Sequence, residues 1–176
     1  MTYVIDQEYR YTSEQFKDAT GTAGTFMSNF YQLEIPVTDE LGLLYWNSEG
    51  YYMSRRTRDA DVKRQIAHMS ELGGKYSRRA KYRFELDQDL YDRAYYMIES
   101  VCKKFSTNPH LAEKLCKIEG HIMEKNSWGD TFFGVSDKTM RGANMLGKIL
   151  MKTRDNILEG KQINYESNFR NTRTGN

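Results

Sequence analysis

A glycine-rich segment that runs directly into a helical pattern has the residue types and spacing best suited to chemistry. It comprises residues 130–134, a polar loop, and residues 142–154. Glycines and Asn144 at the start of a helix leave its first N–H groups accessible, which suits a phosphate or another anion. Asp130 and Phe133, just before it, could hold a sugar or a base. The alternative is a junction in which Gly and Asn serve turn geometry alone.

A second candidate group lies on a shorter predicted helix. Ser48 is predicted to be its N-cap, with Glu49 in the first turn. At helical spacing Glu49, Tyr52, Met53 and Arg56 share one face. A carboxylate and a guanidinium on one face indicate either a plain ion pair or two charges that point together into a pocket.

Lysine and arginine concentrate in two clusters, of which the second is interleaved with aromatic residues. The first comprises Arg55, Arg56, Arg58, Lys63 and Arg64, and the second comprises Lys75, Arg78, Arg79, Lys81 and Arg83, with Tyr76, Tyr82 and Phe84. Basic residues mixed with aromatic ones are typical of a nucleic-acid footprint. The alternative is a solvated helix face, because the formal net charge of the chain is only +2.

Composition places the chain among globular proteins. It has 176 residues, 39% of them hydrophobic and 28% charged, which fits one ordinary domain rather than a disordered chain. The two cysteines and three histidines have no metal-ligand spacing, so no metal or cofactor is indicated. The N-terminus has no signal-peptide pattern and no stretch is apolar enough to span a membrane, so we expect a cytoplasmic protein without a membrane partner.

The elements that must position these residues are mostly helices. The pattern predicts two short strands at 33–37 and 41–46, and helices that begin at residue 48, cover 91–105, begin at Pro109 and cover 144–157. Because no strand–helix–strand series is present, the expected class is α+β, and the pattern argues against a Rossmann interpretation of the glycines. We expect one domain over residues 1–160 and a polar, flexible tail over 161–176.

The motifs, in their order along the chain, resemble the NADAR family of N-glycosidases. The resemblance spans residues 26–158, and its most specific part is the block from 142 to 154. The matching stretches are Ser28-Asn29-Phe30-Tyr31, Ser48-Glu49-Gly50-Tyr51-Tyr52, residues 97–105, Glu124, residues 130–134, and the block that includes Gly142, Asn144, Leu146, Gly147 and Arg154.

This resemblance implies a mainly helical α+β fold and hydrolysis of a bond between a ribose C1 and an exocyclic amine. It implies that Glu49 and Asp130 are the catalytic carboxylates that support an oxocarbenium-like transition state. Its further binding residues would be Ser28, Asn29, Phe30, Tyr52, Arg56, Glu124, Phe133, Gly134, Asn144, Leu146 and Arg154. Arg56 and Arg154 would meet phosphate, although for Arg154 an internally paired or solvent-facing charge stays an alternative.

The sequence departs from the family pattern at four positions. The usual His is Gly50, the usual Gln is Met53, the usual Lys is Arg56 and the usual Trp is Phe133. Arg56 keeps the charge, whereas Phe133 keeps a stacking surface but loses the indole N–H. These departures indicate a divergent member with altered substrate choice, or a non-catalytic binder of ADP-ribose or modified nucleic acid.

Three hypotheses about function follow from the resemblance. The two basic clusters favour ADP-ribose attached to guanine in single-stranded DNA, with nucleotide or DNA as partner and a phage counter-defence as one possible setting, in which case the cytoplasm is that of the host. The second hypothesis is a phosphoribosylamino-pyrimidine of riboflavin synthesis. The third is the non-catalytic binder.

Overall fold

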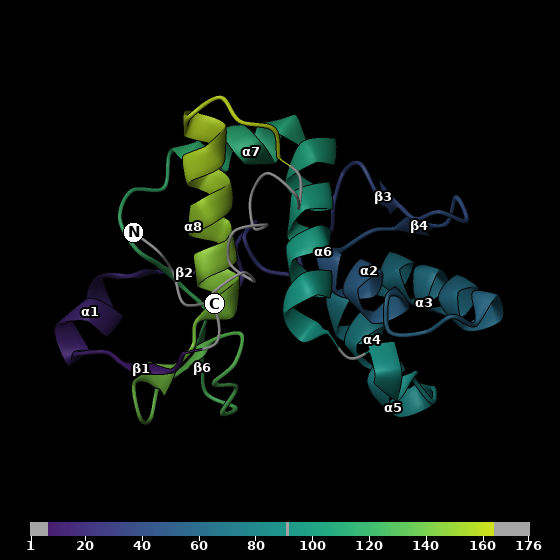
Figure 1. The fold of residues 1–176 in the computed structure, drawn as a ribbon, viewed down its shortest axis with the longest axis horizontal. Helices are drawn as coiled ribbons and strands as arrows, with labels where there is room; N and C mark the ends of the chain where they lie inside the picture. The colour runs from purple at the N-terminus through teal and green to yellow at the C-terminus, as the bar shows by residue number, and fades with distance from the viewer. Residues whose placement is uncertain (1–6, 91, 164–176) are drawn as a thin grey trace, which may run out of the picture. The chain divides into compact units, whose positions relative to one another are not determined.

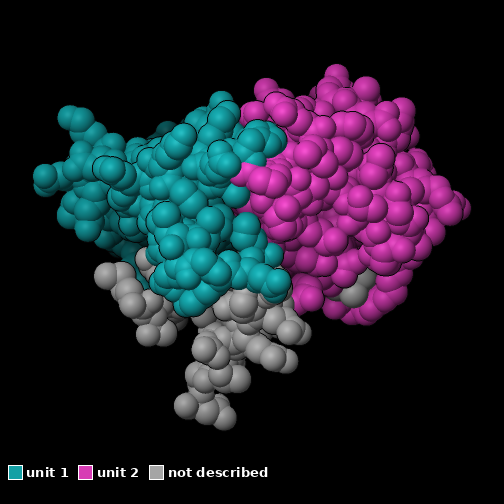
Figure 2. Space-filling model, turned by 90° about the horizontal axis from the view of Figure 1, so that it is seen from above, with its two compact units in different colours: residues 1–27, 110–176 teal, residues 28–109 magenta. Residues whose placement is uncertain are grey.

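The computed structural model describes residues 7–90 and 92–163, and these residues form two compact units. Unit 1 comprises residues 1–27 and 110–176, and unit 2 comprises residues 28–109, coloured separately in Figure 2. The predicted tail at 161–176 lies outside the described residues except for its first three positions. Among the described residues, no helix is both long and apolar enough to cross a bilayer.

Unit 2 is built around helix α2 (Ser48–Ser54), all of whose residues are buried. Helices α3 (Ala60–Leu72), α4 (Gly74–Arg78) and α6 (Arg93–Thr107) pack against α2 (Figure 1). The remaining elements of this unit are α5 (Ala80–Arg83), the 3-10 turn η1 (Gln88–Leu90), and the antiparallel strands β3 (Val37–Thr38) and β4 (Leu44–Tyr45). Strands therefore form near the two predicted ranges, 33–37 and 41–46, but each strand is only two residues long.

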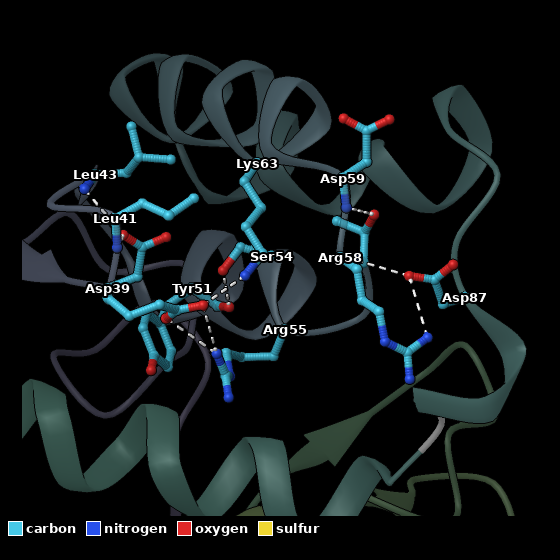
Figure 3. Close-up of polar contacts among 12 residues, drawn as sticks. Asp39, Leu41, Leu43, Tyr51, Ser54, Arg55, Arg58, Asp59, Lys63 and Asp87 are labelled. Atoms are coloured by element: carbon cyan, nitrogen blue, oxygen red, sulfur yellow. Dashed lines mark hydrogen bonds and ion pairs between the residues drawn. The ribbon is translucent and has the colours of Figure 1, made fainter.

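The turn between β3 and β4 is held by a side chain. Asp39 Oδ1 accepts hydrogen bonds from the amides of Leu41 and Leu43, both at 2.9 Å, and its Oδ2 accepts one from the hydroxyl of Tyr45. Burial and the neighbouring Asp39 raise the pKa of Tyr45. Figure 3 shows this turn beside the ion pairs of α2 and α3. A local carboxylate thus fixes the hairpin that the short ladder alone could not hold.

Unit 1 is organised around helix α8 (Met145–Leu158), which packs against strand β5 (Ile122–Met123). The α7 helix (Pro109–Cys116) begins at the proline, as its position before an apolar pattern predicts. Unit 1 also contains three short ladders. They pair β1 (Tyr9–Arg10) with β8 (Arg141–Gly142), β2 (Thr20–Gly21) with β5, and β6 (Lys125–Asn126) with β7 (Val135–Ser136). The first ladder is antiparallel and the other two are parallel.

One helix of unit 1 was not expected. Helix α1 (Ser13–Asp18) begins at a capping box, in which Thr12 accepts from the amide of Gln15 and the Gln15 side chain accepts from the amide of Thr12. None of its residues is buried, so it has no apolar period that could announce it. The helical elements and scattered short strands confirm the predicted α+β class.

Candidate functional site

The carboxylate of Glu49 is held at the first turn of α2 in unit 2. The N-cap of this helix is Asn47, whose Oδ1 accepts from the Gly50 amide at 2.8 Å. The prediction that Ser48 is the N-cap is therefore wrong by one residue, because the Asn side chain one position earlier makes the capping bond. The amide of Glu49 donates to the carbonyl of Asn29 at 3.0 Å, and Glu49 is only 7% exposed.

Asn47 is a residue that sequence reasoning missed. Besides capping α2, its Oδ1 accepts from the Ser77 hydroxyl at 3.0 Å, and its Nδ2 donates to Gln32 and to the carbonyl of Ser70. It is completely buried. The sequence signal for this role is an Asn directly before the predicted helix start at Ser48, because Asn is among the favoured N-cap residues. Asn47 therefore joins α3 and α4 to the N-terminal end of α2, the helix that carries Glu49.

Two buried side-chain oxygens beside Glu49 have no hydrogen-bond partner within residues 7–90 and 92–163. They are Asn29 Oδ1 and Ser48 Oγ. The Asn29 Nδ2 donates to the Met97 sulfur at 3.1 Å, so the amide is oriented. Buried polar atoms without partners are rare in folded proteins and call for an explanation. A bound molecule with hydrogen-bond donors is one that fits a site beside a carboxylate.

The predicted residues Ser28 and Phe30 form the turn that presents Asn29. Ser28 Oγ accepts from the amide of Phe30 at 3.1 Å, which closes a short local turn. The Ser28 carbonyl accepts from Lys104 Nζ at 3.0 Å. Unit 2 therefore brings together Ser28, Asn29, Phe30 and Glu49.

Lys104 is the second residue that sequence reasoning missed as a candidate. It is 1% exposed, and burial lowers the pKa of its ammonium group to about 7. Its Nζ lies 5.7 Å from the Tyr31 ring centroid and 5.4 Å from that of Phe105. On α6 it follows Ser100 by four residues, and the Ser100 hydroxyl donates to the Ser48 carbonyl. One face of α6 thus contacts both the start of α2, at Ser48, and the turn that begins at Ser28.

Arg56 follows α2 rather than lying on it. Its amide donates to the Met53 carbonyl, and its own carbonyl accepts from the Asp87 amide at 2.9 Å. Its Nη1 lies 3.9 Å from the Met53 sulfur. Tyr52 is 5% exposed, so most of its ring is already packed inside unit 2. Of the predicted helix face, Glu49, Tyr52 and Met53 lie within α2, and Arg56 lies just beyond its end.

Most cations of the first basic cluster are ion-paired inside unit 2. Lys63 Nζ lies 2.8 Å from Glu40, Arg55 contacts both Glu40 and Glu99, and Arg58 contacts Asp87 and Asp89. Figure 3 shows Arg58 beside Asp87. Lys63 and Arg55 lower the pKa of Glu40. Arg64 pairs with Asp61. The positive charges of these four residues are therefore balanced by carboxylates of the same unit, which favours the alternative to a nucleic-acid footprint.

In unit 1 the segment 130–134 folds back onto the start of α8. Its carbonyls accept the amides that precede and open the helix, namely Ala143 to Thr131, Asn144 to Gly134, Met145 to Phe132 and Leu146 to Phe133. The prediction of accessible helix amides for an anion is therefore wrong at these positions. The carbonyls of the preceding loop already accept hydrogen bonds from these amides, and the spacing of residues in the sequence does not reveal such bonds.

Asp130 shapes that loop. Its Oδ1 accepts from the amides of Phe132 and Phe133, at 2.9 and 3.0 Å, and its own amide and carbonyl bond to the side chain of Asn126. This is an Asx-type turn. The rings of Phe132 and Phe133 meet edge to face, with centroids 4.8 Å apart. The half-buried Phe133 ring is thereby presented by a carboxylate-fixed turn.

Asn144 and Glu124 are joined directly. Asn144 Oδ1 accepts from the Glu124 amide at 3.0 Å, and Asn144 Nδ2 donates to the Ile122 carbonyl at 2.9 Å. Asn144 has a positive φ of 51°, which Asn tolerates better than most residues, and it is completely buried. Its two polar atoms thus serve the backbone around Glu124. Unit 1 therefore brings together Glu124, Asp130, Phe133, Gly134, Asn144 and Leu146.

Arg154 does not lie with that group. It comes nine residues after Met145 on α8, about 14 Å along a helix axis. Its Nη1 donates to the carbonyls of Ile118 and Gly120, and its Nε pairs with Asp155. The internally paired alternative is the arrangement observed, so we remove Arg154 from the proposed phosphate contacts. Within the described part of the chain there is also no group of three His, Cys, Asp or Glu residues that could hold a metal.

Comparison with known proteins identifies the family. The family model described as the NADAR domain matches residues 15–158, which is most of the chain. This chain belongs to the NADAR family. The resemblance predicted from the motifs is therefore confirmed.

Two curated relatives of this NADAR protein carry functional names. A riboflavin biosynthesis protein of Vibrio vulnificus is 28% identical over 140 residues, 79% of this chain but only 37% of that protein's length. An N-glycosidase of Nostoc punctiforme is 32% identical over 136 residues, 74% of this chain and 83% of that protein. Together with the family, these names support N-glycosidase activity in general terms.

A solved structure shares the fold. The NMR structure of the Escherichia coli protein YbiA matches with a TM-score of 0.62 and 21% identity, covering 76% of this chain and 78% of that one. At this identity the match bears on the fold alone.

Proposed function

We propose that this protein is an N-glycosidase that hydrolyses the bond between a ribose C1 and an exocyclic amine, and that it removes ADP-ribose from guanine bases of DNA. The observation that carries the proposal is that two buried oxygens, Asn29 Oδ1 and Ser48 Oγ, have no hydrogen-bond partner among the described residues. The Asn29 carbonyl accepts a hydrogen bond from the Glu49 amide, and Ser48 directly precedes Glu49. Hydroxyl groups of a ribose are donors that would satisfy both oxygens.

Glu49 is the proposed catalytic carboxylate. Cleavage of the C1–N bond leaves positive charge on the sugar, and a buried carboxylate stabilises that charge or accepts a proton from the attacking water. Water supplies the new C1 oxygen, and the departing amine takes a proton. Because Glu49 is 7% exposed, the interaction would act in a medium of low polarity, where it is stronger than in water.

Lys104 is the proposed source of the proton for the departing amine. A pKa of about 7 leaves comparable amounts of ammonium and amine near neutral pH, which suits proton transfer. Its contact with the Ser28 carbonyl keeps it beside the turn that carries Asn29. Ser28 and Phe30 would then act by holding that turn, while Tyr52 and Arg56 would complete the ring and phosphate contacts.

The residues of unit 1 enter the proposal through the family resemblance alone, which implies a loop that holds a ring of the substrate. Phe133 would stack on a ring of the substrate, and Asp130 would position it through the Asx-type turn rather than react itself. Glu124 is kept as a second carboxylate, positioned by Asn144. Gly134 and Leu146 support the loop through their backbone contacts with the start of α8.

Hydrolysis of a phosphoribosylamino-pyrimidine is the second candidate function, favoured by the name of the Vibrio relative. A substrate panel separates the possibilities. Native protein is incubated with a guanine-ADP-ribosylated single-stranded oligonucleotide and, separately, with the phosphoribosylamino-pyrimidine, and products are measured by liquid chromatography and mass spectrometry. We expect ADP-ribose from the oligonucleotide; turnover of the pyrimidine alone would replace our proposal with the second candidate.

The departures at Gly50, Met53 and Arg56 leave a non-catalytic binder as the contrasting outcome. A Cβ at Gly50 would lie 2.8 Å from the Ser70 Cβ and 3.2 Å from the Ser77 hydroxyl. The position is therefore packed against α3 and α4, which accounts for the missing His in steric terms. Calorimetry with ADP-ribosyl-guanosine distinguishes the two: a binder gives stable association with intact ligand, whereas the proposed enzyme consumes it.

A further inference from the structure

The two basic clusters that look alike in sequence differ in the structure. In the first, Arg55, Arg58, Lys63 and Arg64 all form ion pairs with carboxylates of unit 2. In the second, no ion pair within residues 7–90 and 92–163 involves Lys75, Arg79, Lys81 or Arg83. Lys75, Arg79, Lys81 and Arg83 therefore present positive charge that no carboxylate of the described residues neutralises.

The second cluster lies on the short helices α4 and α5, which together we call the basic segment (residues 74–84). The segment contains five Lys and Arg residues and no acidic residue. Its inward positions are the small residues Gly74, Ser77 and Ala80, all buried, at a spacing of three. This spacing turns larger basic and aromatic side chains outward, and Lys75, Arg79, Tyr82 and Arg83 are exposed.

Exposed aromatic rings alternate with those cations. Tyr82 is 80% exposed and Tyr76 is 44% exposed. Lys81 Nζ lies 4.7 Å from the Tyr82 ring centroid, and the Arg79 guanidinium carbon lies 4.9 Å from that of Tyr76. Each pair places a cation for a phosphate next to a ring face for a base. Rings of this kind stack on bases that are not already stacked in a duplex.

The basic segment is attached to the candidate site of unit 2. A Cβ added at Gly74 would collide with the Phe30 backbone, so α4 packs directly on the turn that carries Asn29. Ser77 donates to Asn47, the cap of the helix that carries Glu49. The basic segment thus contacts both the turn that carries Asn29 and the cap of the helix that carries Glu49.

We propose that the basic segment binds single-stranded DNA, with Arg79 and Lys81 on phosphates and Tyr82 stacked on a base. This inference names where the polyanionic substrate of the proposed function docks, and it rests on that proposal. Phosphate contacts make such binding fall as salt rises, by about one unit of log–log slope per contact. Arg55, Arg58, Lys63 and Arg64 of the first cluster contribute no comparable contact, because each is already paired with a carboxylate.

The test measures binding of unmodified, fluorescein-labelled oligo-dT by fluorescence anisotropy over a range of salt concentrations. The variants are Arg79→Gln/Lys81→Gln, Tyr82→Ala and the charge-matched control Arg58→Gln/Arg64→Gln. We expect the first pair to weaken binding about 10-fold or more and to lower the salt slope by about two. Tyr82→Ala should weaken it about 5-fold or more, and the control should stay within about 2-fold of native.

Equal losses in the two double variants, or native binding that does not depend on salt, would overturn the inference. Binding of oligo-dT needs no turnover, so it is independent of the glycosidase result. A protein that binds through the basic segment but releases no ADP-ribose refutes the proposed function and not the surface. A protein that releases ADP-ribose while its binding is unchanged in Arg79→Gln/Lys81→Gln refutes the surface and not the function. Circular dichroism checks that each variant is folded.

Discussion

The backbone amide of Glu49 donates to the backbone carbonyl of Asn29 at 3.0 Å. This bond couples the start of α2 to the turn at residues 28–31, so the carboxylate and the Asn29 amide group share one rigid attachment. Because the contact is between backbones, either side chain can be changed without breaking it. The two side chains can therefore be tested separately.

Asn29→Ala should weaken substrate binding and leave folding nearly unchanged. The side chain gives up only a contact with the Met97 sulfur, while its Oδ1 has no partner among the residues described. Loss of one buried hydrogen bond to substrate predicts a KM increase of about 10-fold. Steady-state kinetics and a thermal melt check this; an unchanged KM with a collapsed Tm would give Asn29 a structural role only.

Asp130→Asn and Asp130→Ala should differ. The Asn side chain retains the Oδ1 that accepts the Phe132 and Phe133 amides, whereas Ala removes it. We expect kcat/KM to stay within about 10-fold of native for Asn and to fall by a further factor of about 10 for Ala, since the turn loses its acceptors. If Asn abolishes activity as completely as Ala, the carboxylate charge itself is required and the positioning role is wrong.

Gly147→Ala should destabilise unit 1. A Cβ at Gly147 would collide with the Ile122 carbonyl and with the Asn144 amide group that bonds to it. Overpacking against backbone predicts a loss of about 2–3 kcal/mol in the free energy of unfolding. Gly21→Ala is the matched control, because the nearest atom to its Cβ is the Lys125 Cδ at 3.9 Å. Urea titrations compare the two, and equal midpoints would contradict the packing described for α8.

Lys104 should make stability depend on pH. Its folded pKa of about 7 lies below the ordinary 10.5, so between these values the unfolded chain binds a proton that the folded chain does not. The free energy of unfolding therefore rises with pH across this window, by at most about 1.4 kcal/mol per pH unit. Urea titrations at pH 7.5 to 9.5 should show this rise in native protein and its absence in Lys104→Met. Parallel curves would contradict the burial of a titrating lysine.

The helices α6, α7 and α8 were predictable from sequence, whereas α3 and the two-residue ladders of unit 1 were not. The period of α6 and the Pro109 start of α7 carry strong local signals. The ladders of unit 1 consist of two-residue strands that pair across distant parts of the chain, such as Thr20 with Ile122. Two residues are too few to show a period of two, so pairing of this kind has no local signature.

Only part of the proposed site followed from the sequence, because Asn47 and Lys104 were missed. Motif order identified Glu49 and the turn at residues 28–31. Three other features depend on tertiary contacts. They are the hydrogen bonds from the amides at the start of α8, the internal contacts of Arg154 and the burial of Lys104. A lysine in an apolar helical pattern reads as an ordinary surface residue until its neighbours are known.

The most direct test of the account is the release of ADP-ribose from a guanine-ADP-ribosylated single-stranded oligonucleotide by native protein, Glu49→Gln and the control Glu85→Gln. Glu85 is an exposed carboxylate of the same unit. We predict release by native protein and by Glu85→Gln, and a rate lower by about 100-fold or more in Glu49→Gln with an unchanged Tm. Release at the native rate by Glu49→Gln, or no release by folded native protein, would contradict the central claim.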